Sequence, residues 1–261
     1  MNLLASLLAV VLGWAPSFGG FETVAAQPPQ PPAKVAQAEG ALAGKVIVLD
    51  AGHQLGNHNF PAEINRLVEA GGFTKPCNTT GTATNGGYDE ATFAWRVTGK
   101  LKAKLERAGA TVVLTRTSNR EDRWGPCVDV RGRAGNEVSA DLKISIHGDG
   151  SLSSGAHGFH VIYPPSRAPW TDDIAKPSKR LAVVTKDALA GKGFSVANYI
   201  AGGDGLDPRT DLGTLNLSDI PTVMVELGNM RDSGDASVMT SATGQARYAR
   251  ALAVAVRTFL G

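Results

Sequence analysis

A short apolar run near residue 46 constrains the fold more than any other feature of the chain. Residues 46–49 are all aliphatic, and the run stops at Asp50-Ala51-Gly52-His53. A short apolar run bounded by turn residues predicts a strand buried on both faces, as in a parallel sheet. Because ligands of open α/β sheets bind beyond the carboxyl ends of the strands, His53 is a candidate functional residue.

Strand and helix patterns alternate along the rest of the chain. The predicted strands are short apolar runs, whereas the predicted helices carry apolar residues three and four positions apart. This alternation predicts a single α/β domain with a mostly parallel or mixed twisted sheet flanked by helices. Residues 54–87 show little periodicity and are expected to form a long functional loop. The expected helices cover residues 89–108, 130–139, 178–190 and 241–260, and the expected further strands cover 110–116, 142–146, 158–163, 195–200 and 221–229.

Composition narrows the class of protein. The chain has 261 residues, of which 43% are hydrophobic, so it can bury one substantial core. Its net charge is only +2, and the Lys and Arg residues are scattered along the sequence. A nucleic-acid partner is therefore not expected.

Two further strands carry chemically active side chains near their ends. His147 follows the strand 142–146, and Glu226 lies in the last strand. A buried carboxylate is costly unless it is paired or bound to a cation. Two imidazoles and one carboxylate are a ligand set of catalytic zinc sites that keep a fourth position for water. These residues form no compact motif such as HExxH, so their spacing alone does not establish a metal site.

Other polar residues near these strands have weaker claims to function. Glu90 opens the first long helix, where an acidic residue interacts favourably with the helix dipole. His58 lies in a polar loop and is expected to be solvated, and His160 is expected to be structural or solvent-facing. His157 could approach the site from the start of its strand. Asp50 could either accept a hydrogen bond from the ring of His53 or hold the turn.

The amino-terminal segment predicts export followed by a tether. Residues 3–12 are apolar but too short for a membrane span, and Val24-Ala25-Ala26 offers a cleavage site. Residues 1–26 are therefore expected to be a signal peptide, with an uncleaved anchor as the alternative. The Pro-rich residues 27–43 are expected to be a linker, and residues 44–261 to be the folded domain. We expect a protein secreted to the periplasm or cell wall, with no stable membrane span after processing.

The two cysteines, Cys77 and Cys127, both lie in loop-like surroundings. In an exported protein an even number of loop cysteines favours a disulfide. Two free thiols are the alternative. A thiolate metal site is less favoured, because the sequence contains no CxxC spacing.

Beyond these patterns, the sequence resembles the zinc-dependent N-acetylmuramoyl-L-alanine amidases of the amidase-3 family, above all secreted mycobacterial and actinobacterial members. The resemblance implies one zinc ion bound by His53, Glu90 and His147, with Glu226 as the catalytic carboxylate. The chain departs from the family's usual pattern in residues 54–58 and at Asp149. The matching segments occur in the family's order and are residues 46–53, Glu90, and residues 109–116, 131–136, 140–147 and 220–228.

The resemblance further implies that residues 44–261 are a zinc amidase catalytic domain. Such an enzyme cleaves the amide between N-acetylmuramic acid and the L-alanine of the stem peptide, so its expected partners are muropeptides. Arg209 or Arg116 could orient the carboxylates of the substrate, although a surface salt bridge is at least as good an explanation for each. We expect a monomer. We also expect its site to be accessible without an activator, because residues 164–217 are too few for the inhibitory helix found in some family members.

Two rival functions are compatible with the same residues. A zinc peptidase or carboxypeptidase could use an open α/β sheet with histidine and glutamate ligands. A non-catalytic peptidoglycan-binding module could keep the fold without the chemistry. The presence of His53, Glu90, His147 and Glu226 together favours an enzyme over the binding module.

Overall fold

The computed structural model describes residues 40–261, so the predicted signal peptide and residues 27–39 of the predicted linker lie outside the described residues. A six-stranded sheet forms the centre of the domain, in the order β4-β1-β5-β8-β6-β7. Strands β4, β1, β5 and β8 are parallel, β6 is antiparallel to β8, and β7 is parallel to β6. The predicted mixed α/β sheet is therefore confirmed. The strands are β1 (Val46–Ala51), β4 (Thr111–Leu114), β5 (Leu142–Asp149), β6 (His160–Tyr163), β7 (Leu206–Pro208) and β8 (Thr222–Asn229).

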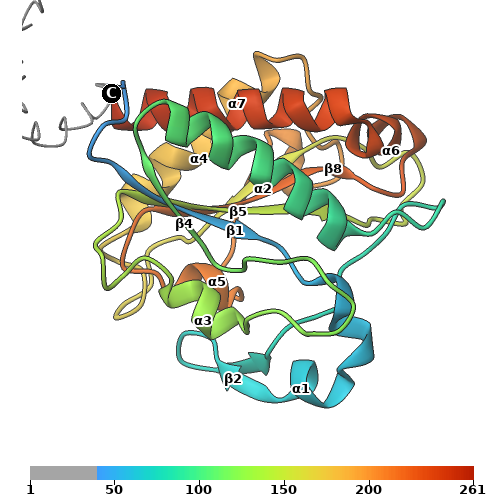
Figure 1. Ribbon diagram of the computed structural model, residues 1–261, viewed down its shortest axis with the longest axis horizontal. Coiled ribbons are helices and arrows are strands. Elements are labelled where there is room, and N and C mark those ends of the chain that lie inside the picture. Colours follow the sequence, from blue (N-terminus) through green and yellow to red (C-terminus); the bar gives the residue numbers. More distant parts are fainter. Residues whose placement is uncertain (1–39) are drawn as a thin grey trace, which may run out of the picture. The chain divides into compact units, whose positions relative to one another are not determined.

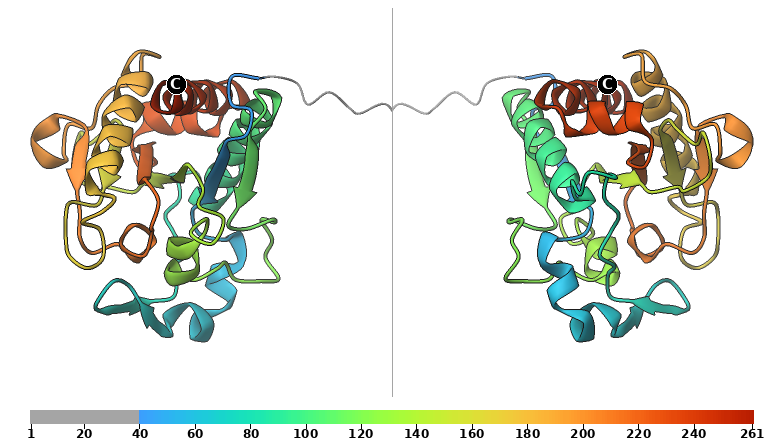
Figure 2. Two further views of the ribbon diagram at one scale, coloured as in Figure 1. Left: turned by 90° about the vertical axis from the view of Figure 1, so that its left-hand side faces the viewer. Right: turned by 90° about the vertical axis from the view of Figure 1, so that its right-hand side faces the viewer.

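Helices cover both faces of this sheet, but the helices on one face are much longer than those on the other (Figure 1). The long helices α2, α4 and α7 and the short helix α6 lie on one face, whereas shorter elements lie on the other face (Figure 2). No helix among residues 40–261 is both long and apolar enough to cross a membrane. The helices are η1 (Leu55–Asn59, 3-10), α1 (Pro61–Asn65), α2 (Glu90–Arg107), α3 (Val128–Arg133), α4 (Ala175–Ala190), η2 (Ala201–Gly203, 3-10), α5 (Gly213–Asn216), α6 (Ser233–Thr240) and α7 (Ala242–Leu260).

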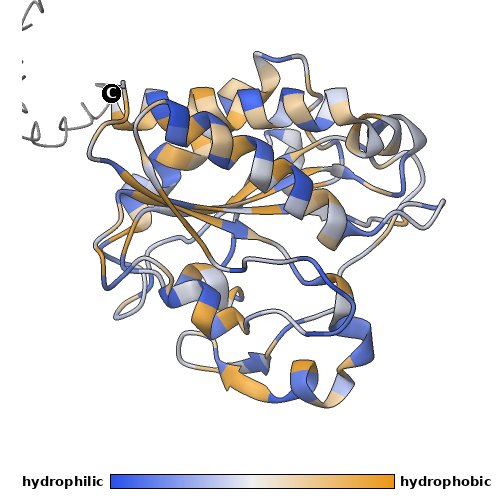
Figure 3. Cartoon of the chain, in the orientation of Figure 1, coloured by the Kyte–Doolittle hydropathy of each residue, from blue (hydrophilic) through white to orange (hydrophobic). Residues whose placement is uncertain are grey.

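The main hydrophobic core lies between the sheet and the long helices. Hydrophobic residues concentrate along the strands and alternate with polar residues along the long helices (Figure 3). In α2, the side chains of Phe93, Val97, Leu101 and Leu105 are fully buried, as their four-residue spacing predicts. This burial fixes the rotation of α2 about its axis, and so it determines where Glu90 at its first position points.

The segment between β1 and α2 contains more regular structure than its sequence suggests. It includes η1, α1 and a small antiparallel hairpin of β2 (Leu67–Glu69) and β3 (Thr74–Pro76). A disulfide joins Cys77, directly after β3, to Cys127, directly before α3. Both cysteines are buried together with Val68, and Val128 at the start of α3 packs against them, so the bridge and a small apolar cluster hold the hairpin against α3.

Several predicted elements differ from those in the structure. The strand expected at residues 195–200 makes only an isolated bridge, between Val196 and Phe159, and the edge of the sheet is instead formed by β7. The sequence hid β7 because it ends in a proline, which only edge strands tolerate well. Helix α4 begins three residues before the predicted start at Ser178, which is buried and accepts a hydrogen bond from the Thr222 amide. Helix α3 covers residues 128–133 and not 130–139.

Candidate metal centre

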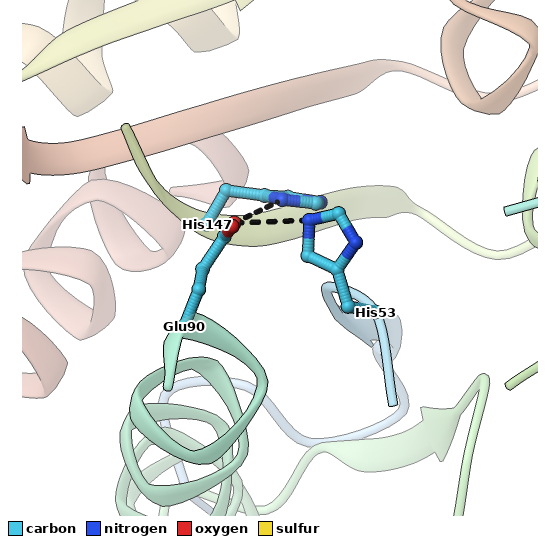
Figure 4. Close-up of side chains that lie close together, drawn as sticks. All are labelled: His53, Glu90 and His147. Atoms are coloured by element: carbon cyan, nitrogen blue, oxygen red, sulfur yellow. Dashed lines mark hydrogen bonds and ion pairs between the residues drawn. The ribbon is translucent and has the colours of Figure 1, made fainter. Parts of the chain in front are cut away.

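The parallel strands bring the distant candidate residues to one place. His53 lies two residues beyond β1, His147 lies in β5, and Glu226 lies in β8, where it is the register partner of His147. Glu90 reaches the same place from the first turn of α2, so it joins His53 and His147 (Figure 4). The helix-dipole explanation for Glu90 is therefore incomplete, because this carboxylate contacts two imidazole rings.

Glu90 stands between the two histidines. Its Oε1 lies 3.1 Å from Nε2 of His53 and 2.8 Å from Nδ1 of His147. The two imidazole rings meet edge to face, with centroids 4.9 Å apart. One potential ligand atom from each residue lies within 4.8 Å of the other two, close enough to share one metal ion.

Local backbone features allow this close approach. A Cβ on Gly52 would lie 2.4 Å from a carbon of the His147 ring, and a Cβ on Gly81 would lie 2.8 Å from Oε2 of Glu90. Both positions therefore require glycine. His53 itself has a φ of +54°, a left-handed conformation that costs a residue with a side chain roughly 1–2 kcal/mol. The surrounding structure must compensate for this cost.

The electrostatics of the cluster favour a charged carboxylate. Burial alone would raise the pKa of Glu90, but His53 and His147 hold it well below its usual range. Burial likewise opposes a charged His53 ring, yet the charge and hydrogen bond of Glu90 and the Thr79 carbonyl raise its pKa. Thr79 contacts His53 Nδ1 through its carbonyl at 3.1 Å and its hydroxyl at 3.2 Å. This contact leaves Nε2 of His53 facing Glu90.

Glu226 has a different environment from Glu90. It is half-buried, and its buried Oε2 has no hydrogen-bond partner among the described residues. Burial raises the pKa of Glu226 well above its usual value, and the charges of Glu90 and Asp149 raise it further, whereas Arg209 lowers it. A pKa shifted by burial and neighbouring charges in a cleft is typical of groups that transfer protons in catalysis.

A cleft of about 360 Å³ opens over these four residues. Its walls come from the β3 end of the hairpin, the loop of residues 78–82, and the segment 209–214. Arg209 lines the cleft, and its guanidinium pairs with both oxygens of Asp211, at 2.9 and 2.8 Å. Lys75, which sequence reasoning did not single out, also lines the cleft and donates to the Asp211 carbonyl at 2.7 Å.

Arg116 does not reach the cleft, and the expectation that it binds substrate is wrong. Its side chain is buried and donates to main-chain carbonyls, including those of Ala51 and Ala91. Asp50 is buried as well, but it accepts from Arg131, Thr115 and Ser145 and not from His53. The apolar pattern of the strand before Asp50 gave no sign of these buried polar side chains.

The remaining histidines lie outside the cluster. His58 is exposed beside Glu121, as expected for a solvated loop residue. His157 is held by Gly155 and does not line the cleft. His160 is buried on β6 as the register partner of Glu226, so it is structural and not solvent-facing.

The residues present fit a catalytic zinc ion. Two imidazole nitrogens and one carboxylate oxygen match a known donor set of such sites, which leave a fourth position open. The Thr79 acceptor on the outer nitrogen of His53 is the kind of support that orients metal-binding histidines. The unpartnered Glu226 carboxylate faces the same cleft.

Known proteins share both the sequence pattern and the fold. Residues 47–258 match the family N-acetylmuramoyl-L-alanine amidase, Amidase_3. The N-acetylmuramoyl-L-alanine amidase Rv3717 of Mycobacterium tuberculosis is 42% identical over 220 residues, which cover 84% of this chain and 88% of the relative. The crystal structure of the N-acetylmuramyl-L-alanine amidase Ami1 from Mycobacterium smegmatis superposes with a TM-score of 0.77 at 38% identity, covering 84% of this chain and 98% of Ami1.

A more distant match extends beyond mycobacteria. The probable cell wall amidase LytH of Staphylococcus aureus is 26% identical over 201 residues, covering 76% of this chain. The match spans about half, 52%, of LytH itself.

Proposed function

This chain belongs to the N-acetylmuramoyl-L-alanine amidase family Amidase_3, and on that premise we propose that it is a zinc-dependent peptidoglycan amidase. It hydrolyses the amide between the lactyl group of N-acetylmuramic acid and the first L-alanine of the stem peptide. His53, Glu90 and His147 hold one zinc ion, and Glu226 is the catalytic carboxylate. The observation that supports this most strongly is the convergence of His53, Glu90 and His147 beside an unpartnered Glu226.

Zinc would supply a Lewis acid that polarises the scissile carbonyl and makes water more acidic. Glu226 takes a proton from the water that attacks the carbonyl carbon, then delivers it to the departing nitrogen of L-alanine as the C–N bond breaks. The products are the lactyl carboxylate and an intact stem peptide with a free amine. The raised pKa of Glu226 suits a group that must both accept and return a proton.

The rim of the cleft suits an anionic peptide. Arg209 and Lys75 both lie there, and both contact Asp211. We propose that a substrate carboxylate competes with Asp211 for Arg209. Because Arg209 holds its partner through two parallel hydrogen bonds, it can present the same fork to a carboxylate of the stem peptide.

The cellular setting follows the same proposal. Residues 1–26 serve as a signal peptide, residues 27–43 as a linker and residues 44–261 as the catalytic domain. The protein acts as a monomer outside the cytoplasmic membrane, at the cell wall or in the periplasm. Muropeptides or polymeric peptidoglycan are its substrates.

A defined soluble muropeptide tests the proposal. The zinc-loaded protein, without any added protein, should release the complete stem peptide from the sugar, as measured by product masses. A zinc peptidase or carboxypeptidase would instead shorten the stem peptide and leave it attached. A binding module would leave the masses of both parts unchanged, and either result would refute the amidase assignment.

A further inference from the structure

Two buried arginines converge beneath the turn that carries His53. Resting on the proposed metal site, we propose that Arg116 and Arg131 are its positioning residues. Their guanidinium groups hold the turn of residues 51–53 in the shape that presents His53 to Glu90 and His147. Arg131 also lines the cleft, but both arginines contact the turn of His53 only at main-chain carbonyls, so their effect on the His53 ring is exerted through the backbone.

The turn needs donors from outside itself. His53 adopts a left-handed conformation. Carbonyl groups in such an irregular, buried turn must be satisfied by side chains or water. Without these partners the turn would relax toward a conformation in which the His53 ring leaves the cluster.

Arg131 supplies one set of donors. Its Nη1 donates to the Ala51 carbonyl at 2.8 Å, and its Nη2 donates to the His53 carbonyl at 2.7 Å. Its Nε donates to the Pro126 carbonyl at 2.9 Å, so the guanidinium is itself held in place. The charge is balanced by the buried Asp50, whose carboxylate contacts the same Nη1.

Arg116 supplies the second set of hydrogen-bond donors to the turn, and it also contacts the segment that carries Glu90. Its Nε donates to the Ala51 carbonyl at 2.9 Å, and its Nη2 lies 3.2 Å from the Gly52 carbonyl. The same Nη2 donates to the Ala91 carbonyl at 2.8 Å. Ala91 directly follows Glu90, so one guanidinium fixes the turn of His53 relative to the start of α2.

Asp50 connects strand β5, which carries His147, to Arg131. Its Oδ2 accepts a hydrogen bond of 2.6 Å from the Ser145 hydroxyl, and Ser145 lies two residues before His147 in β5. The Arg131–Asp50 pair therefore joins the turn of His53 to the strand of His147. Together, the two arginines connect all three segments that carry the proposed ligands.

Guanidinium groups are needed for this arrangement. Each arginine donates to several carbonyls that lie in different directions, which its planar fork can satisfy and the single ammonium of lysine cannot. Keeping two cations buried side by side is unfavourable, and burial together with the nearby Arg131 lowers the pKa of Arg116 to about 9. The presence of two buried guanidinium groups in spite of this cost is consistent with a positioning role, which an apolar side chain without hydrogen-bond donors cannot fill.

Measuring zinc affinity distinguishes two roles for the arginines, positioning of the zinc ligands and stabilisation of the fold alone. We would prepare Arg116→Lys and Arg131→Lys as metal-free proteins and measure zinc affinity by competition with a chromophoric chelator. Circular dichroism would establish that each variant is folded at the temperature used. The expected result is a loss of affinity of about 10- to 100-fold, the range known for groups that orient metal ligands.

Arg247→Lys is the matched control. Arg247 also donates to two main-chain carbonyls, those of Lys192 and Gly193, but it touches none of the ligand segments. Its substitution should leave zinc affinity within about twofold of the wild type, since its contacts lie outside the network that tunes ligand orientation. If Arg116→Lys and Arg131→Lys also bind zinc like the wild type, even with lowered stability, the positioning role is wrong.

The Arg116→Lys variant keeps the experiment informative if the Arg131→Lys variant does not fold. It leaves the buried Arg131–Asp50 pair intact, so it decides the question alone if Arg131→Lys does not fold. Failure of the proposed function gives a different result. Wild-type protein that binds zinc through these residues but releases no stem peptide would refute the amidase and leave the positioning role standing.

Discussion

His147 and Glu226 lie directly opposite each other on the neighbouring parallel strands β5 and β8. This register places a proposed metal ligand beside the proposed proton carrier, and both face the same cleft. Two rigid strands therefore fix the relation between metal and base. Such placement on regular elements is more exact than placement on loops.

Replacing Glu226 with glutamine should separate binding from chemistry. The variant keeps the size of the side chain but removes the proton acceptor, so kcat should fall about 10²- to 10⁴-fold. Zinc content should stay at the wild-type level, because Glu226 is outside the ligand set. Measurement of kcat and bound zinc on the same preparation tests this, and wild-type turnover by the variant would exclude the catalytic role.

The pH dependence of kcat/KM should report the pKa of Glu226. Glu226 must be deprotonated to accept a proton, so kcat/KM should fall as the pH drops through its pKa. Arg209 lowers that pKa, and its removal in Arg209→Gln should therefore move the acid limb to higher pH. The exposed Arg123 is the control, and Arg123→Gln should leave the limb in place. A limb that stays fixed or moves to lower pH in Arg209→Gln would contradict this assignment.

Metal binding should stabilise the folded protein. A ligand at about 1,000 times its dissociation constant adds about 4 kcal/mol to the free energy of unfolding. The melting temperature of metal-free protein should therefore rise when zinc is added, and His53→Ala should lose most of this rise. An equal rise in wild type and variant, measured by calorimetry, would show that zinc binds elsewhere.

The disulfide should contribute to stability independently of the metal. Cys77 and Cys127 are 50 residues apart, and closing a loop of this length stabilises a protein by about 4 kcal/mol. The double variant Cys77→Ser/Cys127→Ser should lose much of this free energy in denaturant unfolding. Unchanged unfolding would mean that the apolar contacts around Val68 alone hold the hairpin.

Sequence patterns predicted the parts of the fold that repeat regularly. The apolar run before His53 and the four-residue spacing of α2 each express burial on a known face, so β1 and α2 could be located from the sequence. Family resemblance then added Glu90, whose position at a helix start has an ordinary explanation. Its contact with two imidazoles depends on tertiary packing that no local pattern encodes.

The polar residues beneath the site could not be assigned from the sequence. Arg116 was a candidate for orienting substrate carboxylates, yet it is buried, and the carbonyl groups of an irregular turn accept its hydrogen bonds. Lys75 lies in a hairpin that lacked a recognisable periodic pattern, and its contact with Asp211 spans a large separation in sequence. Such contacts depend on the folded arrangement of several segments.

Anomalous diffraction at the zinc absorption edge, from crystals of the zinc-loaded protein, would locate the metal ion relative to these four residues. We expect a strong peak about 2.0–2.2 Å from a nitrogen of His53, an oxygen of Glu90 and a nitrogen of His147, with Glu226 beside it but not bound. A peak at other residues, or none at this cluster in protein that cleaves muropeptide, would contradict the proposed zinc site.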